Sequence, residues 1–259
     1  MRGLDGKIIV VAGGGTAAAG PGNGAATAIR LADEGASVVV GDLRGAAAAT
    51  TVDLIRSRGG RAVPFEFDIA DDGSVRALVE CAAEHYGGVD GLHVNAADIS
   101  PEVLGVDGET DLLTIPLEVW QRTLDVNLTG FLLMARAVIP EMLERGGGGI
   151  TNTVSDAIHA GERVRVGYAA TKSALTAVTR HIASRWGRDG IRCNSVSPGI
   201  IARNDEEAEA LQATRRREPR SPRAGRPDDI AAIVAYLLSD DGAWVNGQVW
   251  SVNGGRMFS

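Results

Sequence analysis

The chain has 259 residues, of which 44% are apolar and 23% charged, and its formal net charge is -7. This length and composition predict a single folded α/β domain spanning residues 1–259, with a sizeable apolar core. The acidic balance argues against nucleic acid as a partner. The apolar run from Ile8 to Ala12 is too short for a membrane span or a secretory signal, so we expect a cytoplasmic protein with no membrane partner.

The two cysteines, Cys81 and Cys193, are far apart and lie outside any C-x-x-C or Cys/His spacing. This pattern predicts neither a disulfide framework nor a structural metal site. We expect both thiols to be reduced and buried, and we expect no metal in the protein.

Short apolar segments alternate with amphipathic ones along the whole chain. Six segments predict helices: Ala25–Glu34, Ala46–Arg58, Ser74–Tyr86, Leu117–Glu144, Tyr168–Arg188 and Asp228–Leu238. Seven predict strands: Lys7–Ala12, Ala36–Gly41, Arg61–Phe67, Gly91–Asn95, Gly149–Val154, Arg192–Val196 and Gly247–Val252. Strands this apolar are typical of parallel sheets covered on both faces. We therefore expect a Rossmann-like, doubly wound sheet of seven mostly parallel strands with helices on both faces.

Two segments interrupt this alternation, one from Asp98 to Ile115 and a polar one from Arg203 to Arg226 that contains Arg215–Arg217 and Pro219. Ligands of open α/β sheets bind beyond the carboxyl ends of strands, where both segments begin. We expect the first to line a pocket and the second to form a substrate lid. For each, the alternative is a solvated surface loop.

A glycine-rich turn follows the first expected strand and leads into a helix. It contains Gly13, Gly22, Asn23 and Gly24. Glycines allow close approach of the backbone, and the free N–H groups of a helix N-terminus attract a pyrophosphate. We expect these four residues to bind a dinucleotide, the alternative being a purely structural turn.

Asp42 ends the second expected strand and is followed by Leu43. A carboxylate at this place accepts hydrogen bonds from the adenosine ribose and repels a 2′-phosphate, which favours NAD over NADP. Arg44 leaves NADP open, because an arginine can pair with that phosphate.

Two more polar residues follow strands. Asp68, before Ile69, is placed to bond the adenine edge or to cap the next helix. Asn95, before Ala96, can bridge backbone groups beside the cofactor or form an Asx-turn. We expect all four of these residues at the cofactor.

Tyr168 and Lys172 are four residues apart, which places them on one face of a helix. A tyrosine has a pKa near 10, so acting as a base near neutral pH requires its pKa to fall by about two to three units. A buried ammonium and the positive ring of an oxidised nicotinamide can supply this. Ser155 can hold the substrate oxygen while Tyr168 moves its proton. The alternative is a structural tyrosine.

In order and spacing, these motifs resemble those of the short-chain dehydrogenase/reductase family, and the resemblance covers nearly the whole chain. The matching residues are Gly22-Asn23-Gly24, Asp42, Asp68, Asn95-Ala96-Ala97, Asn127, Ser155, Tyr168, Lys172, Pro198-Gly199 and Gly247-Gln248-Val249.

The resemblance implies a catalytic tetrad. Asn127 would kink its helix and hold a water, Ser155 would polarise the carbonyl, Tyr168 would be the acid/base, and Lys172 would bind the nicotinamide ribose. It also implies a homotetramer in which the long helices pair.

The resemblance further implies that Tyr168 and Lys172 contact the cofactor, as do Pro198, Gly199 and Ile201 after the sixth strand. The chain also departs from the family pattern. Eight residues separate Gly13 from Gly22, which is a longer turn than is usual, and Ala12 and Arg203 each stand where a threonine is usual.

The loop from Pro101 to Ile115 is longer than in the family as well. Its acids can meet a polar or cationic substrate, but we expect a solvated rim from Glu102, Asp107, Glu109 and Asp111. Among the histidines, His159 contacts substrate or is an ordinary loop residue. We expect structural roles for His85, His93 and His181.

Together these features predict an enzyme, an NAD(H)-dependent oxidoreductase that interconverts a small-molecule secondary alcohol and a ketone. An alternative is an NADPH-dependent ketoreductase of a 3-oxoacyl or polyketide-type substrate. An alternative of another class is a non-catalytic NAD-binding sensor.

Overall fold

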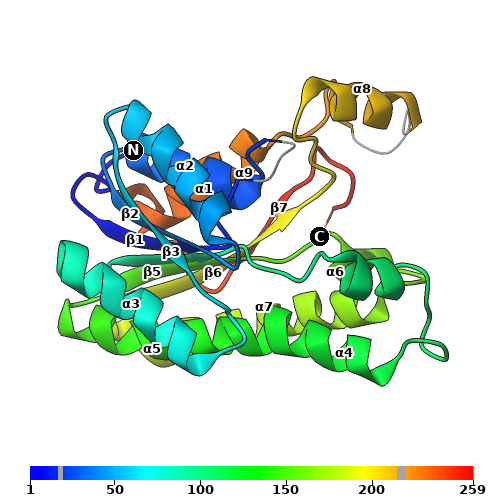
Figure 1. The fold of residues 1–259 in the computed structure, drawn as a ribbon, viewed down its shortest axis with the longest axis horizontal. Helices are drawn as coiled ribbons and strands as arrows, with labels where there is room; N and C mark the ends of the chain where they lie inside the picture. Colours follow the sequence, from blue (N-terminus) through cyan, green and yellow to red (C-terminus); the bar gives the residue numbers. More distant parts are fainter. Residues whose placement is uncertain (17–19, 215–219, 259) are drawn as a thin grey trace.

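The computed structural model describes residues 1–16, 20–214 and 220–258 and contains one parallel sheet (Figure 1). Its strands are β1 (Ile8–Ala12), β2 (Ser37–Asp42), β3 (Arg61–Glu66), β4 (Gly91–Val94), β5 (Gly148–Thr153), β6 (Ile191–Pro198) and β7 (Val249–Val252). The strand order in the sheet is β3-β2-β1-β4-β5-β6-β7, with every neighbouring pair parallel. The order reverses between β1 and β4, which confirms the doubly wound sheet expected from the sequence.

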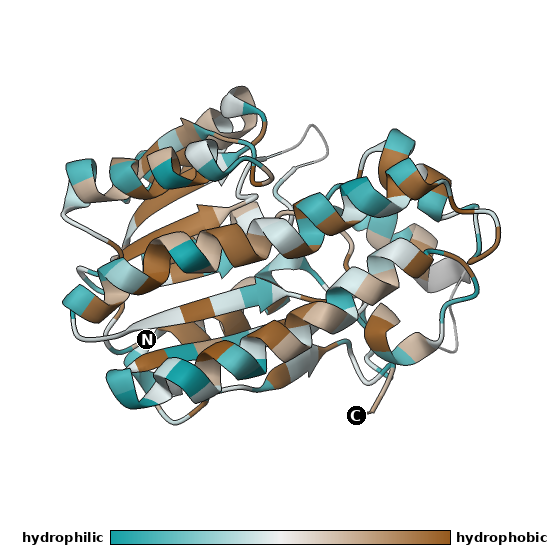
Figure 2. Ribbon diagram, turned by 90° about the horizontal axis from the view of Figure 1, so that it is seen from below, coloured by the Kyte–Doolittle hydropathy of each residue, from teal (hydrophilic) through white to brown (hydrophobic). Residues whose placement is uncertain are grey.

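Helices cover both faces of this sheet (Figure 1). One face carries α1 (Asn23–Asp33), α2 (Gly45–Ser57) and α9 (Pro227–Leu238), and the other carries α3 (Asp72–Tyr86), α4 (Leu117–Leu124), α5 (Gly130–Glu144) and α7 (Val166–Trp186). Successive residues of β1 alternate between the two layers, Ile9 and Val11 facing one core and Val10 the other. Figure 2 shows the apolar strands between helices whose outer faces are polar. Cys81 and Cys193 are free and buried, as predicted.

The helix expected over Leu117–Glu144 is divided by a π-helical turn, η2 (Asp125–Thr129), which lies between α4 and α5. Among the described residues this stretch alone has the length and apolarity of a membrane span, and half of its most apolar part is buried inside the fold. The buried core helix of a globular domain meets the same criterion, so the stretch is weak evidence for a membrane.

Several short elements lie where the sequence predicted loops. They are η1 (Pro101–Gly105), α6 (Ala157–Ala160), α8 (Asp205–Thr214) and η4 (Asp240–Gly242), whereas η3 (Gly187–Asp189) overlaps the end of the helix predicted over Tyr168–Arg188. Helix α8 stands apart from the layered body in the segment expected to form a lid (Figure 1). Arg215–Arg217 and Pro219, in the same segment, lie outside the described residues.

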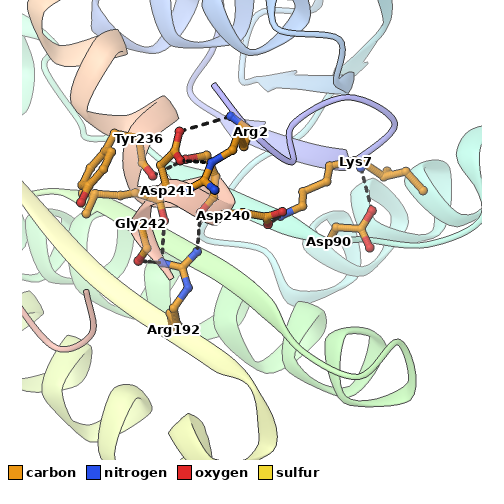
Figure 3. Close-up of polar contacts among 11 residues, drawn as sticks. Arg2, Lys7, Asp90, Arg192, Tyr236, Asp240, Asp241 and Gly242 are labelled. Carbon is orange, nitrogen blue, oxygen red and sulfur yellow. Dashed lines mark hydrogen bonds and ion pairs between the residues drawn. The ribbon is translucent and has the colours of Figure 1, made fainter. Parts of the chain in front are cut away.

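A group of polar contacts joins the chain start to the segment after α9 (Figure 3). Lys7 Nζ lies 2.9 Å from Asp240 Oδ1, and Arg2 Nε lies 2.6 Å from Asp241 Oδ1. The guanidinium of Arg192, near the start of β6, donates to backbone carbonyls at the end of α9 and in η4, at 2.6 and 3.0 Å. Hydrogen bonds and ion pairs thus hold the amino-terminal ends of the strands, and the carboxyl-terminal ends carry the candidate site.

Candidate active site

Helix α7 and the end of β5 bring together the three side chains predicted to do chemistry. Lys172 Nζ lies 5.6 Å from the centroid of the Tyr168 ring and donates a 2.8 Å hydrogen bond to the carbonyl oxygen of Thr153. The Ser155 hydroxyl, two residues beyond Thr153, lies near enough to the Tyr168 phenol to act on its pKa. The carbonyl of Thr153 was missed in the sequence, because any residue supplies such a group and no side chain signals it.

Burial shifts the pKa values of both residues on α7. It lowers the pKa of Lys172 from 10.5 to about 8, since the ammonium is taken out of water. Burial also raises the pKa of Tyr168, although the nearby Ser155 hydroxyl and the charge of Arg165 act in the opposite direction. The lowered phenol pKa expected from the sequence is therefore not reached by the chain alone.

Asn127 lies in the π-helical turn η2, where a kink was expected, and it is 2% exposed. Its Oδ1 accepts a 3.0 Å hydrogen bond from the Asp98 N–H, and its Nδ2 donates to Thr171 Oγ1 at 3.4 Å. Thr171 is the neighbour of Lys172 in α7. Asn127 therefore connects three segments: the loop after β4, the kinked helix and the helix that carries the tyrosine.

The glycine turn after β1 is packed closely enough to require glycine at two positions. Gly13 has φ +78°, and a Cβ there would lie 2.6 Å from Ala96 N. A Cβ on Gly24, at the start of α1, would lie 2.0 Å from Gly13 O. Gly22 and Asn23 form the helix start, Gly22 being the N-cap. These contacts leave backbone N–H groups at the helix N-terminus, which is the cradle a pyrophosphate needs.

Asn95 joins this turn to the middle of the sheet. Its Nδ2 donates to Gly13 O at 3.4 Å, and its Oδ1 accepts from Thr153 Oγ1 at 3.1 Å. Asn95 therefore links one backbone carbonyl to one side-chain hydroxyl, rather than two backbone groups. Thr153 therefore contacts Asn95 through its hydroxyl and Lys172 through its backbone carbonyl.

Asp42 ends β2 beside the same turn. Its Oδ2 accepts from Gly15 N at 2.9 Å, and its Oδ1 accepts from Arg44 N at 3.1 Å and lies 3.9 Å from Arg44 Nε. The Arg44 guanidinium therefore lies within ion-pair distance of the Asp42 carboxylate. Leu43 is exposed at this edge.

The N-cap alternative for Asp68 was wrong. Asp71 caps α3 and accepts from Ser74 N at 2.6 Å, whereas Asp68 Oδ1 accepts from Ala70 N at 2.9 Å in a turn ahead of the helix. Two acids precede this helix, and sequence alone does not tell which one caps it. Ile69, between them, is buried.

Beyond β6, Pro198 is the last strand residue and Gly199 N donates to Val252 O at 3.0 Å. Ile201 pairs with Gly225 in an isolated parallel bridge and lines a cavity of about 420 Å³ beneath α8. Arg203 is turned toward α8, where its Nη2 lies 2.6 Å from Glu207 Oε1. A second cavity, of about 150 Å³, separates the glycine turn from Arg203.

The acids of the loop from Pro101 to Ile115 divide into two groups. Glu102, Glu109 and Asp111 are exposed, as expected of a rim. Asp107 is 0% exposed, so its assignment to a solvated rim was wrong. Its carboxylate is satisfied by backbone N–H groups of α7, which the sequence does not reveal.

The four histidines are spread over the fold. His159 is exposed in α6. His93 is completely buried in β4, where its Nδ1 lies 3.0 Å from Thr151 Oγ1 and burial lowers its pKa to about 3. His85 contacts the carbonyl of its own helix at 3.0 Å, and His181 packs edge-on against Trp186. Within the described ranges, no group of three or more His, Cys, Asp or Glu side chains is arranged to hold a metal ion.

The sequence model described as Enoyl-(Acyl carrier protein) reductase matches residues 17–256. A Bradyrhizobium diazoefficiens protein, named among the short-chain type dehydrogenases/reductases, is 40% identical over 99% of this chain and 89% of its own length. The chain belongs to the short-chain dehydrogenase/reductase family. It is therefore an oxidoreductase of that family.

Two further proteins to which the chain is similar carry more specific names. The cyclohexanol dehydrogenase of Acinetobacter sp. is 37% identical over 91% of this chain and 91% of its own. The solved structure of a 7α-hydroxysteroid dehydrogenase, complexed with NADH and 7-oxoglycochenodeoxycholic acid, has a TM-score of 0.86 and 32% identity over 99% of this chain and 96% of its own.

Proposed function

We propose that this short-chain dehydrogenase/reductase interconverts a secondary alcohol and a ketone with NAD(H), and that Tyr168 is its acid/base. The observation that carries the proposal is the arrangement at the start of α7, where the Lys172 ammonium lies 5.6 Å from the centroid of the Tyr168 ring and the Ser155 hydroxyl acts on the pKa of the phenol. Groups with shifted pKa values that converge at the carboxyl ends of strands are typical of a catalytic site.

The chain's own groups suit a dinucleotide. Gly13 and Gly24 leave no room for a Cβ, so the backbone of the glycine turn is open to a ligand. Asp42 accepts a hydrogen bond from this turn at the end of β2, and Asn95 donates one to Gly13 O. When bound, the nicotinamide supplies or accepts the hydride, and its oxidised ring adds a positive charge to the site. Pro198, Gly199 and Ile201 would also contact it.

Each side chain then has a part in moving the proton. The Ser155 hydroxyl and the Tyr168 phenol would both hydrogen-bond the substrate oxygen. Tyr168 would take the hydroxyl proton during oxidation and return it during reduction. Lys172 would favour the phenolate by its charge, held in place by the Thr153 carbonyl. Asn127, buried at the π-helical turn, would fix Thr171 and the loop after β4 around this group.

NAD is the proposed cofactor because the Asp42 carboxylate would accept bonds from the ribose and repel a 2′-phosphate. The ion pair between Asp42 and Arg44 supports NAD, because it engages the guanidinium that could otherwise bind a 2′-phosphate. The NADPH-linked ketoreductase stays an alternative, since the Arg44 side chain is 67% exposed and its Nε lies 3.9 Å from Asp42, beyond hydrogen-bond distance. A ring alcohol is the proposed substrate class, because the cyclohexanol and hydroxysteroid dehydrogenases act on such alcohols.

Three further features belong to the proposal. Segment 203–226 would serve as the lid, since Ile201 and α8 bound the cavity of about 420 Å³. A homotetramer is proposed because α5 leaves Leu132 and Leu143 exposed, and light scattering should give four times the 26.9 kDa chain mass. The proposed location is the cytoplasm.

The test is a turnover assay on the full chain with NAD and a panel of cyclic and acyclic secondary alcohols, repeated with NADP. We expect oxidation of ring alcohols with NAD, and its loss in Tyr168→Phe. A tenfold or greater preference for NADP would select the ketoreductase alternative. Tight NAD binding without turnover across the panel would select the sensor.

A further inference from the structure

We propose that Asp107, in the long loop between β4 and α4, is a positioning residue for Tyr168. Its carboxylate would hold the first turn of α7 and so fix the phenol against Ser155. This inference rests on the proposed function, in which Tyr168 is the acid/base.

The contacts of Asp107 are those of a helix cap supplied from elsewhere in the chain. Its Oδ1 accepts from Gly167 N at 3.1 Å and its Oδ2 accepts from Tyr168 N at 2.8 Å. Its backbone carbonyl also accepts from Arg165 N at 2.8 Å. The first N–H groups of a helix have no partner inside the helix, and a capping side chain normally satisfies them from the preceding residue.

Helix α7 has no such local cap. Its N-cap residue, Arg165, makes no side-chain capping bond and has φ 63° and ψ 40°. It is the one non-glycine residue with positive φ in the described part of the chain. A left-handed backbone at a non-glycine residue is unfavourable, and the surrounding structure must hold it in place. The three bonds to Asp107 provide that restraint, because they hold the backbone N–H groups of Arg165, Gly167 and Tyr168.

The fit around the carboxylate is close. A Cβ on Gly167 would lie 3.3 Å from Asp107 Oδ2 and 3.5 Å from Ile115 Cδ1. A glycine at this position therefore lets the loop from Pro101 to Ile115 rest directly on the helix. Asp107 itself is completely buried, and a buried charge persists in a fold only when its hydrogen bonds are made. The negative carboxylate also suits the positive end of the helix dipole.

The consequence concerns placement, because Tyr168 receives one of these bonds through its own backbone N–H. A shift of about 1 Å in a reacting group can cost about a hundredfold in rate. The loop from Pro101 to Ile115 thus serves the helix that carries Tyr168. A loop that only bordered the pocket would not need a buried acid bonded to that helix.

The experiment compares wild type, Asp107→Asn and Asp107→Ala with the control Glu109→Gln, which removes an exposed charge from the same loop. We expect kcat to fall about 10- to 100-fold in Asp107→Ala and less in Asp107→Asn, which keeps one acceptor oxygen. The KM for the alcohol and the Kd for NADH should stay within about twofold of wild type. Hydrogen exchange at the Gly167 and Tyr168 amides should become faster in the same order.

A purely structural cap would give faster exchange with an unchanged kcat, and that result would overturn the inference. If Asp107→Ala fails to fold, Gly167→Ala replaces it, since the added Cβ presses on the carboxylate without removing the charge. It should lower kcat while the NADH Kd is kept. Wild-type turnover that is lost in Tyr168→Phe but unchanged in the Asp107 variants would refute only this inference. No turnover in wild type would refute the proposed function as well.

Discussion

Lys172 Nζ lies 5.6 Å from the ring centroid of Tyr168 and 2.8 Å from the carbonyl oxygen of Thr153, so one bond to β5 holds a buried ammonium beside the phenol. Among the residues that the structure describes, no carboxylate forms an ion pair with this ammonium. Its charge is therefore available to whatever negative charge develops on the neighbouring ring.

Replacing Tyr168 by phenylalanine removes the hydroxyl and keeps the ring. We expect kcat for alcohol oxidation to fall at least about a hundredfold, as is usual when a general acid/base is removed. The NADH Kd, measured by fluorescence titration, should stay within about threefold. Tyr86→Phe, at a partly buried tyrosine of α3, is the matched control and should keep wild-type kcat. Retained turnover in Tyr168→Phe would refute the assignment.

Replacing Lys172 by methionine should change how stability depends on pH. The folded pKa near 8, against an ordinary 10.5, corresponds to about 3 kcal/mol. Between these pH values the unfolded wild-type chain binds more protons than the folded one, so this group makes the free energy of unfolding rise with pH. Methionine does not titrate, so the variant lacks that contribution.

Urea unfolding at a series of pH values measures this effect. The unfolding free energy of Lys172→Met minus that of wild type should fall by about 3 kcal/mol from pH 8 to 10.5. Lys7→Met, at the other lysine of the chain, controls for the change in net charge. Parallel pH profiles for wild type and Lys172→Met would contradict the lowered pKa.

Two glycines of the same turn should respond differently to alanine. In Gly24→Ala the new Cβ would lie 2.0 Å from Gly13 O, and backbone must move to admit it. We expect a loss of about 2–3 kcal/mol in stability and NADH binding weakened at least about tenfold. At Gly22 a Cβ meets nothing within 4 Å, and φ is an ordinary −83°. Gly22→Ala should stay within about 0.5 kcal/mol of wild type in thermal unfolding, and equal effects would contradict the crowding.

Removal of the Asp42 carboxylate should weaken the discrimination between the two cofactors. Hydrogen bonds to charged groups contribute about 1.5–3 kcal/mol, so in Asp42→Ala the ratio of kcat/KM for NAD to that for NADP should fall about 10- to 100-fold. Asp53→Asn, at an exposed residue of α2, lowers the negative charge equally and should leave the ratio unchanged. A constant ratio in Asp42→Ala would mean that another residue selects the cofactor.

Much of the fold follows from local sequence. Strands β1 and β2 are nearly continuous apolar runs, because both faces of the sheet are covered. The predicted boundaries of the seven strands agree with the structure to within two residues. The Tyr168 and Lys172 pair follows from helical spacing, and the glycine turn follows from its place between a strand and a helix.

Other features depend on contacts between distant residues. Asn127 lies in a π-helical turn that the apolar periodicity of 117–144 does not reveal, because a turn of this kind shifts the pattern by only one residue. Asp107 was expected at the surface, where most acids lie, since its partners are backbone N–H groups 60 and 61 positions away. Its burial follows only from the packing of the loop against α7.

The candidate site and the anchoring contacts lie at opposite ends of the strands. Arg192 and the pairs made by Lys7 and Arg2 lie at the amino-terminal ends of the strands, and Ser155 and Tyr168 lie at the carboxyl-terminal ends. Substitutions at the amino-terminal ends can accordingly raise thermal stability, and substitutions at the carboxyl-terminal ends can change substrate preference. Because the two sets of residues are far apart, their effects should add.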